Sequence, residues 1–346
     1  MTAPLRLGAR TSPLARAQVE LVGAALSARG VPWTFVGVTT RGDVDRRHLA
    51  EIGGTGLFVG AVRDALRAGS IDVAVHSLKD LPTGAEVDIQ VTAVPAREDT
   101  RDVLIGRRLA DLGDGVRVGT GSPRRAMQLH DWAARSGIAL EVVPVRGNVD
   151  TRIGLADRGE LDAVVLAAAG LRRLGYLRPE PVEGPLRQAQ DGASTGSGHM
   201  PLVVRSLPAE ILDHAVMLPA PGQGALALET FTALAGDARA AVAALDDPVA
   251  AAEVRAERGF LAALEAGCTA PVGTRAVVKS VRGSTADLTL TAVIGRTLLS
   301  NLAEPLPADS VLRFEAHDPA SEPWDFGVHH AGRVLTGLPD LPRPRR

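Results

Sequence analysis

Apolar positions recur along the first hundred residues with two alternating periods. Short apolar runs predict strands at 4–10, 33–40, 71–77 and 88–94. Ser12 and Pro13 begin a stretch with helical spacing that ends near Gly30, and a second helical stretch covers 57–68. Strands that alternate with helices in this way predict a parallel or mixed α/β sheet.

The same alternation restarts after residue 100. Strands are predicted at 102–106, 116–119, 139–145 and 162–166, and a helix is predicted to begin at Ser122 and Pro123. This helix start repeats the one at Ser12. If the two starts face one cleft, their free N–H groups and helix dipoles favour an anion there. Ser-Pro is also a common way to begin a helix, so the repeat by itself is a weak signal.

The remainder of the chain has a different pattern. Residues 178–205 are rich in Pro, Gly and Ser, which predicts a flexible insertion. A strand is predicted at 225–229 and Ala-rich helices at 233–245 and 249–264. Strand-like segments at 275–281, 288–294 and 311–315 then indicate a small α+β domain.

The predicted strand 71–77 ends in a group of polar residues that includes His76, Ser77, Lys79 and Asp80, and Pro82 prevents its continuation. Ligands of open α/β sheets bind beyond the carboxyl ends of strands, so this group lies where chemistry is expected. Lys79 is one of 2 lysines in a chain with 36 arginines, which suggests that a compact ammonium is needed beside Asp80. An ordinary ion pair at the strand end is the alternative interpretation.

Composition excludes several classes of protein. The 346 residues suffice for two or three domains, and a net charge of −2 gives no overall basic field for nucleic acid. We expect no membrane span and no signal peptide, hence a cytoplasmic protein. The single cysteine, Cys268, rules out an intrachain disulfide and a cysteine-rich metal site, and we expect no metal. Free cysteines are usually buried, but Gly267 and Pro271 around Cys268 favour an exposed, reactive thiol.

A set of arginines follows the predicted strands or begins the predicted helices. In an α/β fold these positions converge on one cleft, where guanidinium groups bind carboxylates or phosphates bidentately. The sequence therefore predicts a polyanionic ligand, although any one of these residues could be an ordinary surface arginine. The set comprises Arg10, Arg124, Arg125, Arg146, Arg152 and Arg173.

Taken together, the motifs resemble the porphobilinogen deaminase (hydroxymethylbilane synthase) family, in family order over roughly 5–275. The matching motifs are Arg10-x-Ser12-Pro13-Leu14-Ala15, Gly53-Gly54-x-Gly56-Leu57-Phe58, Val75-His76-Ser77-x-Lys79-Asp80-x-Pro82, Arg97-Glu98-Asp99, Gly119-Thr120-x-Ser122-x-Arg124-Arg125, Arg146-Gly147-Asn148-Val149-x-Thr151-Arg152, Ala169-Gly170-Leu171-x-Arg173-Leu174-Gly175, Pro221-Gly222-Gln223-Gly224 and Gly267-Cys268-x-x-Pro271.

The resemblance implies a fold of two α/β domains, similar to type II periplasmic binding proteins, around a cleft, plus a small C-terminal α+β domain. The domains would be 1–97 with 225–245, then 102–218 with the insertion, and 248–346 with the cysteine. It further implies a dipyrromethane cofactor on a thioether to Cys268, the small-molecule substrate porphobilinogen, and a monomer. The reaction would condense four porphobilinogen molecules head to tail with loss of ammonia, giving hydroxymethylbilane for haem biosynthesis.

The roles of single residues follow from the same resemblance. Asp80 would stabilise the positive charge that develops on pyrrole nitrogen and shuttle protons, with Lys79 as the second catalytic residue. Carboxylates of the cofactor would be held by Lys79, Ser122, Arg124, Arg125, Arg146 and Gly147. Incoming substrate would be held by Arg10, Ser12, Arg152, Arg173 and Gln223.

The chain departs from the family pattern in its Gly-rich loop, where Thr55 and Gly60 occupy positions that usually carry lysine. What those lysines contribute to closing the site would then be absent, or it would be supplied by Arg63 or another arginine. The alternative function is a non-catalytic, two-lobed binding protein for a small carboxylate. Cys268 separates the two hypotheses, because a binding protein has no use for a tethered cofactor.

Overall fold

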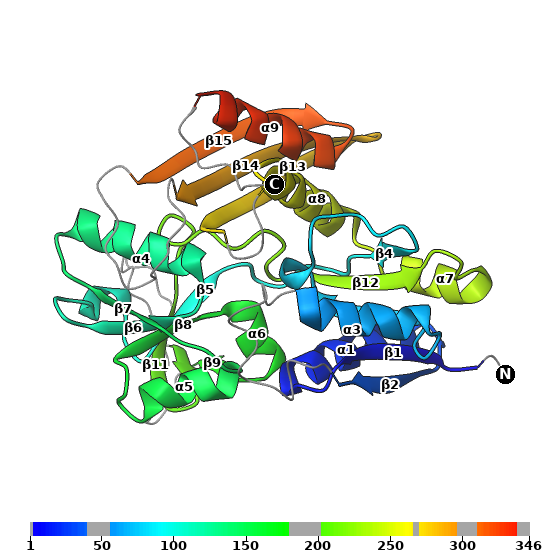
Figure 1. The fold of residues 1–346 in the computed structure, drawn as a ribbon, viewed down its shortest axis with the longest axis horizontal. Helices are drawn as coiled ribbons and strands as arrows, with labels where there is room; N and C mark the ends of the chain where they lie inside the picture. Colours follow the sequence, from blue (N-terminus) through cyan, green and yellow to red (C-terminus); the bar gives the residue numbers. More distant parts are fainter. Residues whose placement is uncertain (1–2, 40–55, 180–201, 266–269, 296–309, 338–346) are drawn as a thin grey trace, which may run out of the picture.

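The computed structural model describes residues 3–39, 56–179, 202–265, 270–295 and 310–337, and these residues form three sheets. Figure 1 shows the three sheets as separate groups of strands, each with its own helices. The predicted fold class, two α/β units plus a small C-terminal α+β unit, is confirmed. No helix within the described ranges is long and apolar enough to cross a membrane.

The first sheet is mixed. Its strands, in spatial order, are β2 (Trp33–Val38), β1 (Leu5–Arg10), β3 (Val73–Ser77), β12 (Leu226–Phe231) and β4 (Ile89–Ala93). β1 is parallel to both of its neighbours, whereas β12 is antiparallel to β3 and β4. The strand predicted at 225–229 therefore inserts between two strands that are close in sequence.

Three helices pack with this sheet: α1 (Pro13–Ser27), α3 (Gly56–Arg67) and α7 (Gly236–Ala243). α1 begins where the sequence predicts, because the side chain of Ser12 accepts a hydrogen bond from the backbone N–H of Ala15. Its buried face carries Val19, Val22 and Leu26, which lie at helical spacing and pack on β1. This packing fixes the direction in which the start of α1 points.

The second sheet is larger than predicted. Its strands, in spatial order, are β7 (Glu141–Pro144), β6 (Arg117–Thr120), β8 (Ala163–Ala167), β5 (Asp102–Ile105), β11 (Leu207–Ile211), β10 (Leu202–Val204) and β9 (Leu177–Pro179). Its helices are α4 (Pro123–Ser136), α5 (Val149–Asp157) and α6 (Ala168–Arg173). The two ends of the predicted insertion 178–205 thus belong to paired strands, β9 and β10, and its centre, 180–201, lies outside the described residues.

The third sheet, β13 (Val272–Arg282), β14 (Thr285–Gly295) and β15 (Val311–Ala320), is antiparallel. It shares a core with α8 (Pro248–Ala263) and α9 (Pro323–Gly337) through Phe260, Leu290 and Phe326. Sequence reasoning missed α9, whose glycines disfavour a helix. A Cβ on Gly327 would lie 2.0 Å from the carbonyl oxygen of Ala256, so glycine is what lets α9 pack directly on α8.

Candidate active site

The turn after β3 presents the two residues that the sequence singled out. β3 is buried at Val73 and Val75, and a single 3-10 turn, Leu78–Asp80, follows its last residue. The side chain of Leu78 is buried, and its N–H donates to the carbonyl of Ala225, 3.0 Å away, in the neighbouring segment. Leu78 thereby fixes the turn to the rest of the domain. Lys79 and Asp80, the next two residues, line the wall of a cavity.

This cavity has a volume of about 920 Å³ and is lined by residues of both α/β sheets. The first sheet supplies Arg10, Lys79 and Asp80, and the second supplies the turn before α5 and the end of α6. The predicted site residues that line it are Asp80, Lys79, Arg125, Arg146, Gly147, Arg10, Ser12, Arg152, Arg173 and Gln223. Residues that were widely separated in the sequence are therefore brought together, as the prediction of a cleft requires.

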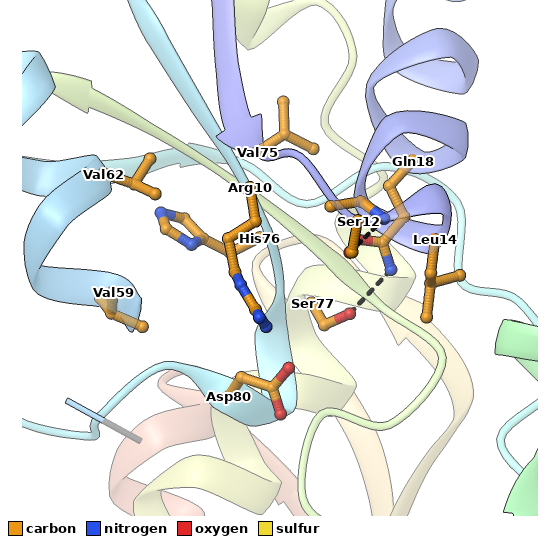
Figure 2. A pocket seen from close by; sticks show the side chains of 11 residues that line it. Arg10, Ser12, Leu14, Gln18, Val59, Val62, Val75, His76, Ser77 and Asp80 are labelled. Carbon is orange, nitrogen blue, oxygen red and sulfur yellow. Dashed lines mark hydrogen bonds between the residues drawn. The ribbon is translucent and has the colours of Figure 1, made fainter. Parts of the chain in front are cut away.

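A smaller cavity of about 270 Å³ adjoins it and shares Arg10, Ser12 and Asp80. Figure 2 shows the side chain of Arg10 extending towards Asp80, between the walls formed by α1 and α3. Val59 and Val62 of α3 make one wall apolar, and His76 lies on the same side. The smaller cavity is thus partly apolar, and the larger cavity beside it is lined mainly by cations.

The charges around the larger cavity are strongly unbalanced, with six basic and two acidic residues, Asp80 and Asp150, in its lining. Asp150 is already bound by the hydroxyl of Tyr176, at 2.7 Å, and by Arg205. Burial lowers the pKa of Arg152 and of Arg173 below the usual arginine value. Burying these cations costs free energy, and carboxylates of a ligand would offset that cost. The lining therefore suits a ligand that brings several carboxylates.

Lys79 is half-buried in the same lining, and desolvation there lowers its pKa to about 8, with the charge of Arg125 contributing in the same direction. Asp80 and Asp102 oppose the shift. Its ammonium lies 3.5 Å from the amide oxygen of Gln223. Lys79 is therefore a lysine whose charge is sensitive to small changes around it.

Asp102, the first residue of β5, is fully buried and pairs with two of the predicted arginines. Its carboxylate lies 2.8 Å from Arg124 and 2.8 Å from Arg125. Burial alone would raise the pKa of this carboxyl, but the two guanidinium groups hold it well below its ordinary value. Arg125 still lines the cavity, whereas Arg124 and Ser122 do not, so a role of these two in holding a cofactor stays a prediction.

Comparison with known proteins identifies the family. A family model described as "Porphobilinogen deaminase, dipyromethane cofactor binding domain" matches residues 5–236, and its C-terminal domain model matches 251–300. The chain belongs to the porphobilinogen deaminase family. Its activity is that of hydroxymethylbilane synthase, it acts in tetrapyrrole biosynthesis, and its cofactor is dipyrromethane. The alternative of a non-catalytic binding protein is thereby set aside.

Curated relatives are similar over nearly their whole length. Porphobilinogen deaminase 1 of Streptomyces coelicolor is 48% identical over 304 residues, which cover 87% of this chain and 86% of the relative. The porphobilinogen deaminase of Acidothermus cellulolyticus is 45% identical over 363 residues, and the match covers 97% of each chain. Among solved structures, a periplasmic substrate-binding protein of an ABC transporter from Coxiella burnetii matches 71% of this chain and 94% of its own, at 12% identity and a TM-score of 0.37.

The structure shows whether Arg63 can take the place of the lysines that the family usually carries in its Gly-rich loop. Both edges of its guanidinium are occupied, by Glu229 at 2.7 and 3.0 Å and by Glu86 at 2.7 Å, and Arg63 lines neither cavity. The expectation that Arg63 replaces a loop lysine is therefore wrong. Gly60 lies within α3, and Thr55 and Cys268 lie outside the described residues.

Sequence reasoning missed Gln18 and the role of Asp102. Gln18 lies on the buried face of α1, one turn from Leu14 and from Val22, and its amide donates to the Ser77 hydroxyl at 2.8 Å (Figure 2). A polar residue on an apolar helix face was a readable signal. Asp102 carried no such signal, because nothing in the sequence places it beside Arg124 and Arg125.

Proposed function

We propose that the larger cavity is where this enzyme joins porphobilinogen units, with Asp80 as the catalytic carboxylate. The observation that carries the proposal is that Asp80 stands in a lining with six basic residues and only one other acid, and that other acid is occupied by its own partners. Porphobilinogen carries an acetate and a propionate, so each unit that is added brings two carboxylates to this lining. Asp80 is therefore the acid of this lining to which we assign the chemistry.

The basic residues would bind and orient. Arg10 lies beside Asp80 at the entrance to the smaller recess, and Arg152 and Arg173 face the same cavity from α5 and α6. The Nε of Arg152 is buried and has no hydrogen-bond partner among the described residues, so it is available to a ligand carboxylate. These features fit a bound dipyrromethane, which would supply the pyrrole carbon that attacks the incoming unit.

Asp80 would act where positive charge builds up. Loss of ammonia and attack by the preceding pyrrole leave positive charge on pyrrole nitrogen, and a carboxylate held beside that nitrogen stabilises the charge. The same carboxylate can accept and return the nitrogen or carbon proton at that ring. The neighbouring ammonium of Lys79 would hold a carboxylate of the ring and would not touch the reacting atoms. Arg125, which lines the same cavity, would bind that carboxylate as well.

The test is Asp80→Asn, which keeps the shape of the side chain and removes its charge. Loss of a group that stabilises transition-state charge costs roughly 10²–10³ in rate, and we expect a fall in kcat of this size at unchanged folding. Asp72→Asn is the matched control, because Asp72 precedes the same strand and pairs with Arg6 away from the cavity. A kcat of Asp80→Asn within a few-fold of the control would refute the assignment.

We further propose that Cys268 carries the cofactor by a thioether, although this residue lies outside the described part of the chain. Its position in a Gly-Cys-x-x-Pro segment and its status as the sole cysteine support the assignment. Intact mass spectrometry of the purified enzyme should show the sequence mass plus one dipyrromethane, and Cys268→Ala should show the sequence mass alone and no turnover. Wild-type turnover by Cys268→Ala would contradict the tether.

The remaining expectations are proposals on the same footing. We propose domains at 1–97 with 225–245, 102–218 and 248–346, and the pairing of β12 with β3 and β4 supports the return of the chain to the first of them. A cytoplasmic monomer remains the expectation for its location and assembly.

A further inference from the structure

The segment that carries Gln223 is pressed against the turn of Lys79. The backbone of Gly222 has φ +74°, and a Cβ there would lie 2.9 Å from the Leu78 side chain and 3.3 Å from the backbone nitrogen of Lys79. The backbone of Gly224 has φ +88°, and a Cβ there would lie 2.3 Å from the carbonyl oxygen of Glu98. Only glycine on both sides allows the side chain of Gln223 to enter this space.

The amide of Gln223 has a fixed orientation. Its Nε2 donates to the carbonyl oxygen of Thr100 at 2.7 Å and to Oδ1 of Asp102 at 2.9 Å. Neither partner can donate in return, because one is a backbone carbonyl and the other a carboxylate that Arg124 and Arg125 keep ionised. The amide oxygen must therefore face the other way.

That oxygen faces cations. Oε1 of Gln223 lies 3.5 Å from Nζ of Lys79 and 3.5 Å from Nη2 of Arg124. A flipped amide would set its N–H groups against both cations and its oxygen against the carbonyl and the carboxylate. The orientation of the amide, and with it the acceptor offered to Lys79, is thus determined by Asp102 together with the carbonyl of Thr100.

We infer that Asp102 and Gln223 are positioning residues for Lys79: Asp102 orients the amide, and the amide oxygen holds the ammonium at the cavity wall. The inference rests on the proposed function in placing Lys79 beside the reacting ring. A neutral acceptor suits this position, since the ammonium is held without a full negative charge that would compete with the carboxylates of the ligand.

The groups that face Lys79 determine the sign of the test. Asp80 beside it and Asp102 on β5 favour its charged form, whereas Arg124 and Arg125 on α4 disfavour it. Asp102→Asn removes a negative charge, and Gln223→Met removes an acceptor from the ammonium. Both changes should therefore lower the pKa of Lys79 below its wild-type value of about 8.

The composition of the chain allows the pKa of Lys79 to be measured. Lys79 and Lys279 are its only lysines, so selective ¹³Cε-lysine labelling gives two side-chain signals, which Lys279→Arg assigns. Lys279 is exposed on β13 and serves as the internal reference in each titration. Asp162→Asn is the matched control, because Asp162 pairs with Arg117 where β6 and β8 of the same sheet begin, and it does not line the cavity.

We expect each of the two variants to lower the Lys79 pKa by at least about half a unit and kcat by about tenfold, with KM within about twofold, since Gln223→Met removes a hydrogen bond to a charged group and Asp102→Asn removes a nearby negative charge. The control should change neither. An unchanged Lys79 pKa in Gln223→Met overturns the inference while leaving the proposed function intact. A shifted pKa with unchanged kcat shows that the network does not serve the reaction and overturns it as well. Loss of activity in Asp80→Asn is a separate result, which the titration does not depend on.

Discussion

The two Ser-Pro helix starts share a sequence pattern and have opposite structural outcomes. At α1, Ser12 caps the helix, and Arg10 just before it extends into the cavity beside Asp80. At α4, Ser122 makes no capping hydrogen bond through its side chain, and Arg124 and Arg125 turn inward to Asp102. The anion that these two arginines bind is therefore one of the protein's own residues.

The difference lies in the strand beside each helix start. β5 begins with a buried carboxylate, Asp102, where the sequence suggested only another apolar strand. A buried carboxylate draws any guanidinium within reach, because neither charge can be left unpaired in the interior. The same residue types thus line the cavity at one helix start and form a buried ion-pair cluster at the other, where only Arg125 also reaches the cavity lining.

The largest effect that would test this contrast between the two helix starts is expected for the stability of Asp102→Leu. It leaves the guanidinium groups of Arg124 and Arg125 buried without their carboxylate, and we expect the free energy of unfolding to fall by roughly 3–5 kcal/mol. Urea denaturation measures it. Asp72→Asn removes a partly exposed pair with Arg6 in the first sheet and should cost no more than about 1 kcal/mol. Similar losses in the two variants would show that the Asp102 cluster is screened by water.

A smaller test compares the two serines directly. Ser12→Ala removes a capping hydrogen bond and should lower the free energy of unfolding by about 1 kcal/mol, whereas Ser122→Ala has no such bond to lose and should change it by less than about 0.5 kcal/mol. The same urea titrations resolve the two. An equal loss at both positions would mean that Ser122 caps α4 in solution, and the contrast between the helix starts would then be confined to the arginines.

Much of the fold could be predicted because the local patterns are unambiguous. Val19, Val22 and Leu26 lie at helical spacing behind Ser12 and Pro13, and Val73 and Val75 alternate along a strand that a proline follows closely. α9 and the strands β9 to β11 could not be predicted in this way. The helix depends on the close approach that Gly327 permits, and the three strands join the sheet through the pairing of β11 with β5, which lies far away along the chain.

The candidate site likewise has features that could be predicted from the sequence and features that could not. Lys79, Asp80 and six arginines stood out by residue type and by their place at predicted strand or helix ends. Which arginines are available was not readable: Arg152 keeps a buried nitrogen without a partner among the described residues, Arg63 is held between Glu229 and Glu86, and Arg124 is bound to Asp102.

The sequence by itself determined the family, the reaction and most of the residues that line the cavity's charged wall, because motifs and periodicity are local properties of the chain. Only the tertiary structure decided which cations line the cavity and which pair with Asp102 or Glu229. A charge inside a protein must find an opposite charge, and its partner is set by the sheet pairing that brings distant residues within a few ångströms.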